Sequence, residues 1–511
     1  MVLSHSLPFQ SVPDNLTSSA NNRHDRAPQS SAHTGKKRAQ IAGQAVVLGA
    51  SIAGLLTARE LAERFEQVVI IERDRLYPNS PRPGVPQTDH VHVLLAKGLE
   101  ILETLFPGLT QELAIAGSPE VDWTADCQMM GFGGWNPRFE SGLTTRTCSR
   151  SLLENLIRKR LRTWHNVEFM SGVSVSGLVI QKGKGERDQV TGVTVRRGTQ
   201  RYSISGELVV DATGRRSALP QWLTEWGYSL PEETTIDAKL GYASQWFEIP
   251  AEYHHHQAAD DTRWNWKSLL IWAKPPYQTR AGVLYPVEGN RWVVTLSGTG
   301  GDYPTAHDQD FLKFARSLRD RAIYQAIRHA VPVSPVKTYR GTANRWRHYE
   351  KMDRFPSRLV ALGDGVCAFN PLYGQGMTVA ALSAQRLGQW LDKTCRSDRS
   401  NLTRGGDRFR KTLGSVLQLP WLMATGEDLR WPKTEGEQPN WWMRALQRYL
   451  KEVLTLTDRF PKIHKRVWHV QHMATHPVSL FHPTVFAPVV GSLLSQGQHS
   501  DQTLPYRGSG R

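Results

Sequence analysis

A glycine-rich turn between two apolar segments constrains this chain more than any other feature. Residues 44–48 form a short apolar run, and residues 49–54 are Gly-Ala-Ser-Ile-Ala-Gly. Residues 55–65 then carry apolar side chains at helical spacing, and residues 68–71 form a second apolar run. This order predicts a strand, a tight turn, a helix and a second parallel strand, which is the opening unit of a doubly wound α/β sheet.

The turn has the spacing of a dinucleotide-binding motif. It matches G-x-G-x-x-G except at the second glycine, where Ser51 stands, and Glu72 follows 23 positions after Gly49 at the end of the second strand. Gly49 permits the tight turn, and Gly54 lets the helix approach the strand. The N–H groups at the helix N-terminus can bind a pyrophosphate, and Glu72 can accept hydrogen bonds from a ribose. We predict a dinucleotide site here, with a chance glycine turn as the alternative.

A second signal about 300 positions downstream indicates which dinucleotide binds. Residues 359–362 are a predicted buried strand, followed by Gly363-Asp364, by residues 371–377 (Pro-Leu-Tyr-Gly-Gln-Gly-Met) and by a helix through residue 391. A flavin uses such an arrangement: Asp364 can accept hydrogen bonds from the ribityl hydroxyls, and a helix starting near Gly374 favours negative charge on the reduced ring. The alternative is a packing turn in which Asp364 caps the helix.

Two shorter motifs lie between these signals, and the ordered set resembles a known family. Residues 149–154 (Ser-Arg-Ser-Leu-Leu-Glu) predict an N-capped helix, and residues 211–214 are Asp-Ala-Thr-Gly. Over about residues 44–395 the set resembles the flavin-dependent monooxygenase superfamily of aromatic hydroxylases, squalene epoxidases, halogenases and geranylgeranyl reductases. The segments 84–95 and 370–377 resemble more closely the polyether olefin epoxidases and their bacterial relatives.

The resemblance implies non-covalent FAD and a role for each matching position. Ser51, Gly54 and Arg150 would contact the phosphates or the ribityl chain, Glu72 the adenosine ribose, and Arg73 the adenine side; Asp364 would hold the ribityl chain, and Gly376 and Met377 would approach the flavin ring. The predicted cofactor-binding residues are Gly49, Ser51, Gly54, Glu72, Arg73, Arg150, Gly214, Asp364, Gly374, Gly376 and Met377. No catalytic acid or base is assigned.

The resemblance also implies the reaction. Reduced flavin would trap O₂ as a C4a-hydroperoxide and hydroxylate or epoxidise an apolar small molecule, inside a site that must exclude water. Thr378 stands where many hydroxylases have Asn, and the Asp-Ala-Thr-Gly motif replaces the Asp-Gly motif that those enzymes associate with NADPH. NAD(P)H and a separate reductase partner therefore both stay open as electron sources. The alternatives are a flavin-dependent reductase of isoprenoid double bonds and a non-enzymatic, basic peripheral flavoprotein.

These signals predict a fold class and its division into domains. We expect an α/β, three-layer, Rossmann-like FAD-binding domain, an inserted and mostly antiparallel substrate domain, and a C-terminal helical segment. Four apolar or alternating runs (242–249, 268–273, 282–287 and 291–297) predict the substrate-domain sheet. The expected boundaries are 1–43 for a disordered leader, 44–235 with 335–395 for the FAD-binding domain, 236–334 for the substrate domain, 396–495 for the helical segment and 496–511 for a disordered tail.

Charge and cysteine content bear on partners and location. The 63 Lys and Arg residues against 47 Asp and Glu give a net charge of +16, but no nucleic-acid-binding signature accompanies it. Residues 441–454 predict an amphipathic, basic, Trp-bearing helix that either packs on the enzyme or rests on an anionic membrane. We expect flavin to be retained when residues beyond about 400 are removed. The scattered cysteines predict no zinc or dithiol site and favour a reducing cytoplasm.

Three histidine-bearing or aromatic patterns carry weaker expectations. His90 and His92 alternate before an apolar helix, so one should face inward, as a packed core residue or a catalytic one. The run 254–256 (His-His-His) lies in a polar loop without metal-ligand partners, so we predict a solvated loop and no metal site. Trp264 and Trp266 are predicted to be strand aromatics.

Overall fold

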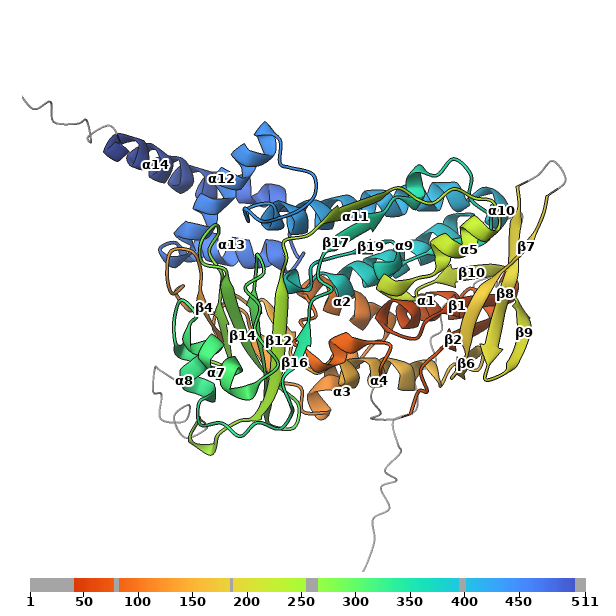
Figure 1. Ribbon diagram of the computed structural model, residues 1–511, viewed down its shortest axis with the longest axis horizontal. Coiled ribbons are helices and arrows are strands. Elements are labelled where there is room, and N and C mark those ends of the chain that lie inside the picture. Colours follow the sequence, from red (N-terminus) through yellow and green to blue (C-terminus); the bar gives the residue numbers. More distant parts are fainter. Residues whose placement is uncertain (1–40, 78–81, 184–186, 254–264, 395–400, 501–511) are drawn as a thin grey trace, which may run out of the picture. The chain divides into compact units, whose positions relative to one another are not determined.

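The computed structural model describes residues 41–77, 82–183, 187–253, 265–394 and 401–500 (Figure 1). Most of the predicted leader and tail therefore lies outside the described residues. The first strand begins at Ile41, which is buried and donates its backbone N–H to the carbonyl of Arg64, and the last helix ends at Ser500. Strand and helix thus extend a few residues beyond the predicted limits of 44 and 495.

A five-stranded parallel sheet forms the first layer. Its strands are β1 (Ile41–Leu48), β2 (Phe65–Glu72), β6 (Val167–Ser171), β10 (Leu208–Asp211) and β18 (Leu359–Ala361), in the order β18-β10-β1-β2-β6. The chain moves outward from β1 in one direction and later returns to the other side of β1. The carboxyl ends of β1 and β10 therefore border the crevice in which doubly wound sheets bind ligands.

Helices and a small sheet cover the parallel sheet. Helix α1 (Ile52–Ala62) contacts β1, β2 and the long helix α9 (Gly376–Thr394), and α9 also contacts α2 (Ala96–Leu105). The antiparallel sheet of β7 (Ser174–Gln181), β8 (Gln189–Arg197) and β9 (Gln200–Ser205) contributes Leu178, Val193 and Val195 to the same core. The predicted α/β fold class is confirmed.

One C-terminal helix belongs to this first core, contrary to our expectation of a separable segment. Helix α11 (Gly406–Asp428) packs on α9, and its Phe409, Leu413 and Leu417 are buried in the core of the parallel sheet. Removal of residues beyond 400 would expose this apolar surface, so we no longer expect such a truncation to retain flavin.

The second large sheet has six strands, and its core contains the predicted meander. The strands are β12 (Gly241–Glu248), β13 (Ser268–Ile271), β14 (Arg280–Val287) and β15 (Arg291–Gly298), extended by β16 (Lys337–Tyr339) and by β4 (Cys127–Met130), in the order β16-β12-β15-β14-β13-β4. All neighbouring strands of this sheet are antiparallel, except that β13 and β4 pair in parallel. The two edge strands come from outside the range 236–334.

The two faces of this sheet differ because side chains alternate along each strand. Ala243, Leu284 and Val294 pack with α7 (Asp308–Arg316) and α8 (Ala322–Ile327). The opposite face carries Tyr285 and Val293, which join a core with Trp123 and Trp468. This second face is turned toward the cavity described below.

The last three helices have a core of their own. They are α12 (Trp441–Thr455), α13 (Pro461–Gln471) and α14 (Pro483–Ser500), and they bury Val453, Ile463, Val467, Val485 and Val489 together. Among the described residues, no helix combines the length and the apolar character needed to cross a membrane. The remaining elements are α3 (Leu109–Ile115), α4 (Arg150–Leu161), α5 (Leu219–Glu225), α10 (Asn401–Arg404), β3 (Glu120–Asp122), β5 (Thr144–Arg146), β11 (Glu233–Ile236), β17 (Asn344–Arg347) and β19 (Cys367–Ala368).

Candidate cofactor site

A cavity of about 490 Å³ lies at the carboxyl ends of the parallel strands. Its wall includes ten of the eleven predicted site residues: Gly49, Ser51, Glu72, Arg73, Arg150, Gly214, Asp364, Gly374, Gly376 and Met377. The eleventh, Gly54, is not among the lining residues. A Cβ atom on Gly54 would lie 1.9 Å from the carbonyl oxygen of Gly49, so this glycine allows α1 to pack tightly against the turn.

Two helix N-termini meet at this cavity. Helix α1 begins after Ser51, and α9 begins at Gly376. The first N–H groups of a helix have no partners inside the helix and favour an anion. Gly49 (φ +98°) and Gly214 (φ +79°) adopt left-handed backbone conformations, and a Cβ on Gly214 would meet no atom within 4 Å. The wall is therefore open at Gly214, whereas a Cβ on Gly49 would lie 2.7 Å from the carbonyl oxygen of Ala212, so Gly49 allows the two turns to approach each other closely.

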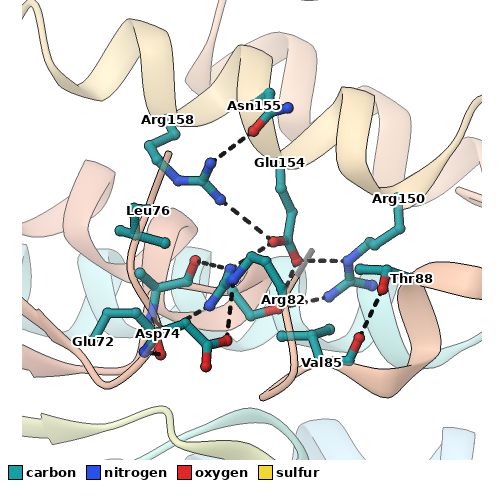
Figure 2. A network of polar contacts seen from close by, with 12 residues as sticks. Glu72, Asp74, Leu76, Arg82, Val85, Thr88, Arg150, Glu154, Asn155 and Arg158 are labelled. Atoms are coloured by element: carbon teal, nitrogen blue, oxygen red, sulfur yellow. Dashed lines mark hydrogen bonds and ion pairs between the residues drawn. The ribbon is translucent and has the colours of Figure 1, made fainter. Parts of the chain in front are cut away.

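A buried ion-pair network stands beside the N-terminus of α1 (Figure 2). Glu154, on α4, accepts hydrogen bonds from Ser51 Oγ at 2.6 Å, Arg150 Nε at 2.7 Å and Arg82 Nη1 at 2.8 Å. Arg150 also donates to Ser51 Oγ at 2.9 Å. Burial alone would raise the pKa of Glu154, but Arg150 and Arg82 hold the pKa of this carboxyl below its ordinary value. The hydroxyl of Ser51 is thereby fixed between two charged groups.

Glu72 is bound on both of its carboxylate oxygens. One oxygen accepts the Ala50 N–H at 2.8 Å and Arg82 Nη2 at 2.7 Å, and the other accepts the Asp74 N–H at 2.9 Å. Burial would lower the pKa of Arg82, but Glu154 and Glu72 raise it. Arg82 thus joins the end of β2 to α4, and the sequence analysis missed it. No sequence motif marked Arg82, because its partner Glu154 was predicted only as part of the helix at 149–154 and not as a residue of the site.

The Asp-Ala-Thr-Gly motif forms a fixed loop after β10. The Asp211 carboxylate accepts the Thr213 N–H at 3.0 Å and also binds the hydroxyls of Thr213 and Ser217. Arg215 lines the cavity and donates to the carbonyls of Ala343 at 2.6 Å and Phe369 at 2.8 Å. This arginine, also missed by the sequence analysis, ties the loop to the segment that precedes α9.

Asp364 differs from the other acidic residues of the site. It follows β18 in a short 3₁₀ turn and lines the cavity. Among the residues that the structure describes, its carboxylate has no hydrogen-bond or ion-pair partner. Its Oδ1 lies 3.9 Å from the position that a Cβ would take on Gly376. An acceptor is therefore available beside the N-terminus of α9 for hydroxyl groups of a ligand.

Another part of the cavity wall is formed by the second sheet and by the segment before α2. Its wall comprises Val91, Val93, Tyr242, Val283, Tyr285, Thr295, Ser297 and Tyr339, which are apolar or uncharged polar residues. Those on β12, β14 and β15 follow the two-residue alternation of a strand, whereas Tyr339 lies on β16 and Val91 and Val93 lie in the segment before α2. One cavity therefore connects the predicted cofactor residues with the predicted substrate sheet.

The two histidines of the alternating pair have different surroundings. His90 is buried behind the cavity-lining Tyr242, with ring centroids 4.7 Å apart; its Nδ1 is 2.8 Å from Ser244 Oγ, and burial lowers its pKa to about 4. His92 lines the cavity, its Nε2 is 2.5 Å from the carbonyl oxygen of Gln87, and burial together with the charge of Arg150 lowers its pKa to about 3. Both rings are neutral at neutral pH.

The remaining patterns fall partly outside the structure. Residues 254–256 and Trp264 lie outside the described residues, whereas Trp266 is buried near Trp292, with ring centroids 5.9 Å apart. Cys127, Cys148 and Cys367 are buried free thiols.

Comparison with solved structures defines the class of fold. A probable FAD-dependent monooxygenase, PqsL of Pseudomonas aeruginosa, matches with a TM-score of 0.55 and 16% identity over 76% of this chain and 98% of that chain. The p-nitrophenol 4-monooxygenase PnpA of Pseudomonas putida DLL-E4 matches with a TM-score of 0.57 and 16% identity, over 83% of this chain and 96% of that chain. The flavin-dependent brominase Bmp2 matches with a TM-score of 0.57 and 12% identity, over 90% of this chain and 100% of that chain. The chain has the fold of the FAD-dependent monooxygenases and halogenases, as the motifs predicted.

The sequence comparison identifies the nearer family. No family model matches the chain. It is 33% identical to Protein Rv3254 of Mycobacterium tuberculosis (strain ATCC 25618 / H37Rv) over 415 residues, which cover 78% of this chain and 83% of that protein. The chain belongs to the family of Protein Rv3254.

Proposed function

We propose that this protein is an FAD-dependent monooxygenase that oxidises an apolar small molecule with O₂. The observation that carries the proposal is the single cavity that joins the ends of β1, β2, β10 and β18 to the uncharged face of the second sheet. A cofactor held at one end of such a cavity meets a substrate held at the other.

The residues present fit FAD. The N-terminus of α1, Ser51 and Arg150 would hold the pyrophosphate; Glu72 and Arg73 would hold the adenosine, although Glu72 already binds Ala50 and Arg82. Asp364 offers a carboxylate to the ribityl hydroxyls, and its lack of a protein partner in the described chain supports this role. Gly374, Gly376 and Met377 would face the flavin ring near the N-terminus of α9. Reduced FAD, when bound, supplies electrons for the activation of O₂.

The uncharged part of the cavity wall supports a neutral, apolar substrate. Valines 91, 93 and 283 provide apolar surface, and the hydroxyls of Tyr242, Tyr285 and Tyr339 can orient a ligand. No charged side chain from the described strands of the second sheet lines the cavity. This lining also helps to exclude water from the reacting atoms. Hydroxylation and epoxidation are both compatible with it.

The test of the function begins with the purified chain. We expect a yellow protein whose FAD is released completely on denaturation, and O₂ consumption with NADH, NADPH or an added flavin reductase that increases with an apolar substrate. Incorporation of isotopically labelled oxygen into the product separates a monooxygenase from a reductase of isoprenoid double bonds, which would work without O₂. A protein that retains FAD but turns over no substrate would favour the non-enzymatic alternative, and a protein that binds no FAD would refute the proposal.

We further propose that the C-terminal helices contact an anionic membrane surface. Residues 441–500 contain seven Lys and Arg residues and two acidic ones, and within the described ranges none of the seven forms an ion pair: Arg444, Arg448, Lys451, Arg459, Lys462, Lys465 and Arg466. Trp441 is 81% exposed, and Phe481 and Phe486 are exposed where Tyr449 of α12 stacks on Phe481 at 4.7 Å. Exposed aromatic residues among basic residues that have no acidic partner are typical of interfacial helices.

Vesicle binding tests this surface. We expect co-sedimentation with anionic vesicles that weakens as salt rises, and little binding to neutral vesicles. Trp441→Ala should reduce binding, whereas Tyr277→Ala, which removes an aromatic ring that is 88% exposed on another part of the chain, should not. Equal binding by both variants and the parent chain, or no binding to either vesicle, would contradict the membrane contact.

The location and the domain boundaries remain proposals. The buried free thiols of Cys127, Cys148 and Cys367 support a reducing cytoplasm. We retain 44–235 with 335–395 as the FAD-binding domain and 236–334 as the substrate domain. To the former we add α11, because it shares that domain's core.

A further inference from the structure

A buried carboxylate links the C-terminal part of the chain to the candidate cofactor site. Asp428 is the last residue of α11 and is 1% exposed. It accepts Tyr373 Oη at 2.6 Å and Asn344 Nδ2 at 2.6 Å, and Asn370 Nδ2 lies 3.0 and 3.1 Å from its two oxygens. Three donors from two other segments therefore converge on one side chain.

Two of these donors belong to the turn that lines the cavity. Asn370 caps the turn Pro371–Tyr373, since its Oδ1 accepts the Leu372 N–H at 3.1 Å and its own N–H donates to Asn344 Oδ1 at 2.7 Å. Tyr373 ends the turn, and Gly374 follows in a left-handed conformation (φ +66°) before α9 begins. Asp428 thus holds both ends of a turn whose Asn370, Pro371 and Leu372 lie on the cavity wall.

The bonding of Asp428 is unusual for a buried acid. In the part of the chain that the structure describes, no Lys, Arg or His forms an ion pair with it. Glu427, the preceding residue, is paired with Arg430 at 2.7 Å. Burial raises the pKa of Asp428 to about 6, against the lowering effect of its hydrogen bonds. A carboxylate held only by neutral donors is costly to bury, so packing alone does not explain its presence.

Resting on the proposed function, we propose that Asp428 is a positioning residue for the FAD site: through Asn370 and Tyr373 it sets the geometry of the turn that faces the flavin ring. Helix α11 then contributes to the geometry of the cofactor site through Asp428. Asp428 is 58 positions from Asn370 and 55 positions from Tyr373 in the chain, and the fold brings the three side chains into contact.

The test compares three variants of the full chain. Asp428→Asn keeps the size of the side chain but replaces an acceptor with a partial donor that opposes Asn370 or Tyr373. Tyr373→Phe removes a single donor and is the milder change. Thr425→Val is the matched control, because Thr425 is buried on the same helix and its hydroxyl donates only to the carbonyl of Trp421, at 2.8 Å. For each, the FAD dissociation constant, the visible flavin spectrum and the thermal midpoint are measured.

We expect Asp428→Asn to weaken FAD binding by at least about tenfold and to shift the visible flavin band, since a hydrogen bond to a charged group is lost. Tyr373→Phe should weaken FAD binding less. In the double variant, the fold-increase in the FAD dissociation constant should be smaller than the product of the two single-variant increases, because both residues act through one turn. Thr425→Val should leave affinity and spectrum unchanged, even with a lower midpoint.

The outcomes separate this inference from the proposed function. If the parent chain binds FAD and both Asp428→Asn and Tyr373→Phe bind it equally well with an unchanged spectrum, the positioning role is overturned and the proposed function stands. If only the thermal midpoint falls, Asp428 is structural and the inference is likewise overturned. If the parent chain itself binds no FAD, the proposed function fails, and this inference with it.

Discussion

At the scale of single residues, the site depends on charges that are buried and paired. Arg82 lies between Glu72 and Glu154, and each acid is less than a tenth exposed. Such a pair adds little net stability, but removing one partner leaves the other charge buried and unpaired. The geometry of the cofactor site therefore depends on an arginine that no local motif marks.

Arg82→Met should lower the free energy of unfolding by about 3–5 kcal/mol, because the buried carboxylate of Glu72 loses its cation and that of Glu154 loses one of its arginine partners. Urea denaturation measures the loss. Lys313→Met removes an exposed cation paired with Asp310 and should cost less than about 1 kcal/mol. Adding Glu154→Gln to Arg82→Met should restore part of the lost stability. If Arg82→Met costs as little stability as Lys313→Met, the network contributes no stability.

Asp364→Ala should weaken FAD binding without a large loss of stability. The carboxylate has no partner in the described part of the chain, so its removal leaves no buried group unsatisfied. Loss of charge-assisted hydrogen bonds to the ribityl hydroxyls corresponds to about 1.5–3 kcal/mol, or roughly 10- to 150-fold in the dissociation constant. Titration of the apoprotein with FAD measures it, with the exposed Asp353→Ala as control. Unchanged affinity in Asp364→Ala would exclude this residue from the site.

At the scale of elements, the turn between β1 and α1 sets the position of the first helix N-terminus. Gly54 is the contact point, because its α-carbon packs against the backbone of Gly49 with no room for a side chain. The helix can therefore start close to the strand and direct its N–H groups into the cavity. Backbone approach, and not a side-chain contact with the ligand, explains this glycine.

Gly54→Ala should destabilise the protein and reduce FAD binding together. The added methyl would lie 1.9 Å from the Gly49 carbonyl oxygen, so α1 must move away from β1. The matched control is Gly426→Ala in helix α11, where a Cβ meets no atom within 4 Å and the alanine should stabilise the helix by up to about 1 kcal/mol. Thermal unfolding and FAD titration are measured for both variants. If Gly54→Ala changes neither stability nor FAD affinity, the close contact between Gly54 and Gly49 is not required.

At the scale of the whole chain, the C-terminal helices are tied to the second sheet and to α2. His472 is 1% exposed, its Nδ1 accepts the Ala96 N–H at 3.2 Å, and its carbonyl accepts the Lys97 N–H at 3.2 Å. Trp468 of α13 packs in the core that contains Trp123 and Tyr285. Helix α13 therefore closes the side of the sheet that also lines the cavity.

His472 should make the fold sensitive to acid. Burial lowers the pKa of His472 to about 3, whereas in the unfolded chain it is about 6.5, so below pH 6.5 the unfolded chain binds the proton first. Its contribution to stability is complete above pH 6.5 and is lost as the pH falls toward 3, at about 1.4 kcal/mol per pH unit.

His472→Gln retains an acceptor for the Ala96 N–H and does not titrate. Between pH 7 and pH 5 the parent chain should therefore lose about 2 kcal/mol more stability than the variant. Thermal and urea unfolding at both pH values compare the two proteins. If the parent chain and the variant lose the same stability between pH 7 and pH 5, His472 is protonated as easily in the folded protein as in the unfolded chain, and this prediction is wrong.

What the sequence determined by itself is local. The strand, turn and helix around Gly49, the strand before Gly363-Asp364 and the alternation of residues 282–297 follow from backbone sterics and from the period of apolar residues, and all were predicted close to their observed bounds. Ten of the eleven proposed site residues line one cavity, because the carboxyl ends of parallel strands meet at the same edge of a sheet.

The tertiary structure alone decided which charged groups are buried together. Arg82 meets Glu154 across 72 positions and Asp428 meets Asn370 across 58, and helix α11, expected to be separable, belongs to the first core. Neither pairing has a sequence period, because the cost of burying a charge depends on which distant donors the fold brings within hydrogen-bond distance. Local pattern can place a residue at the end of a strand, but only the packed chain determines what that residue touches.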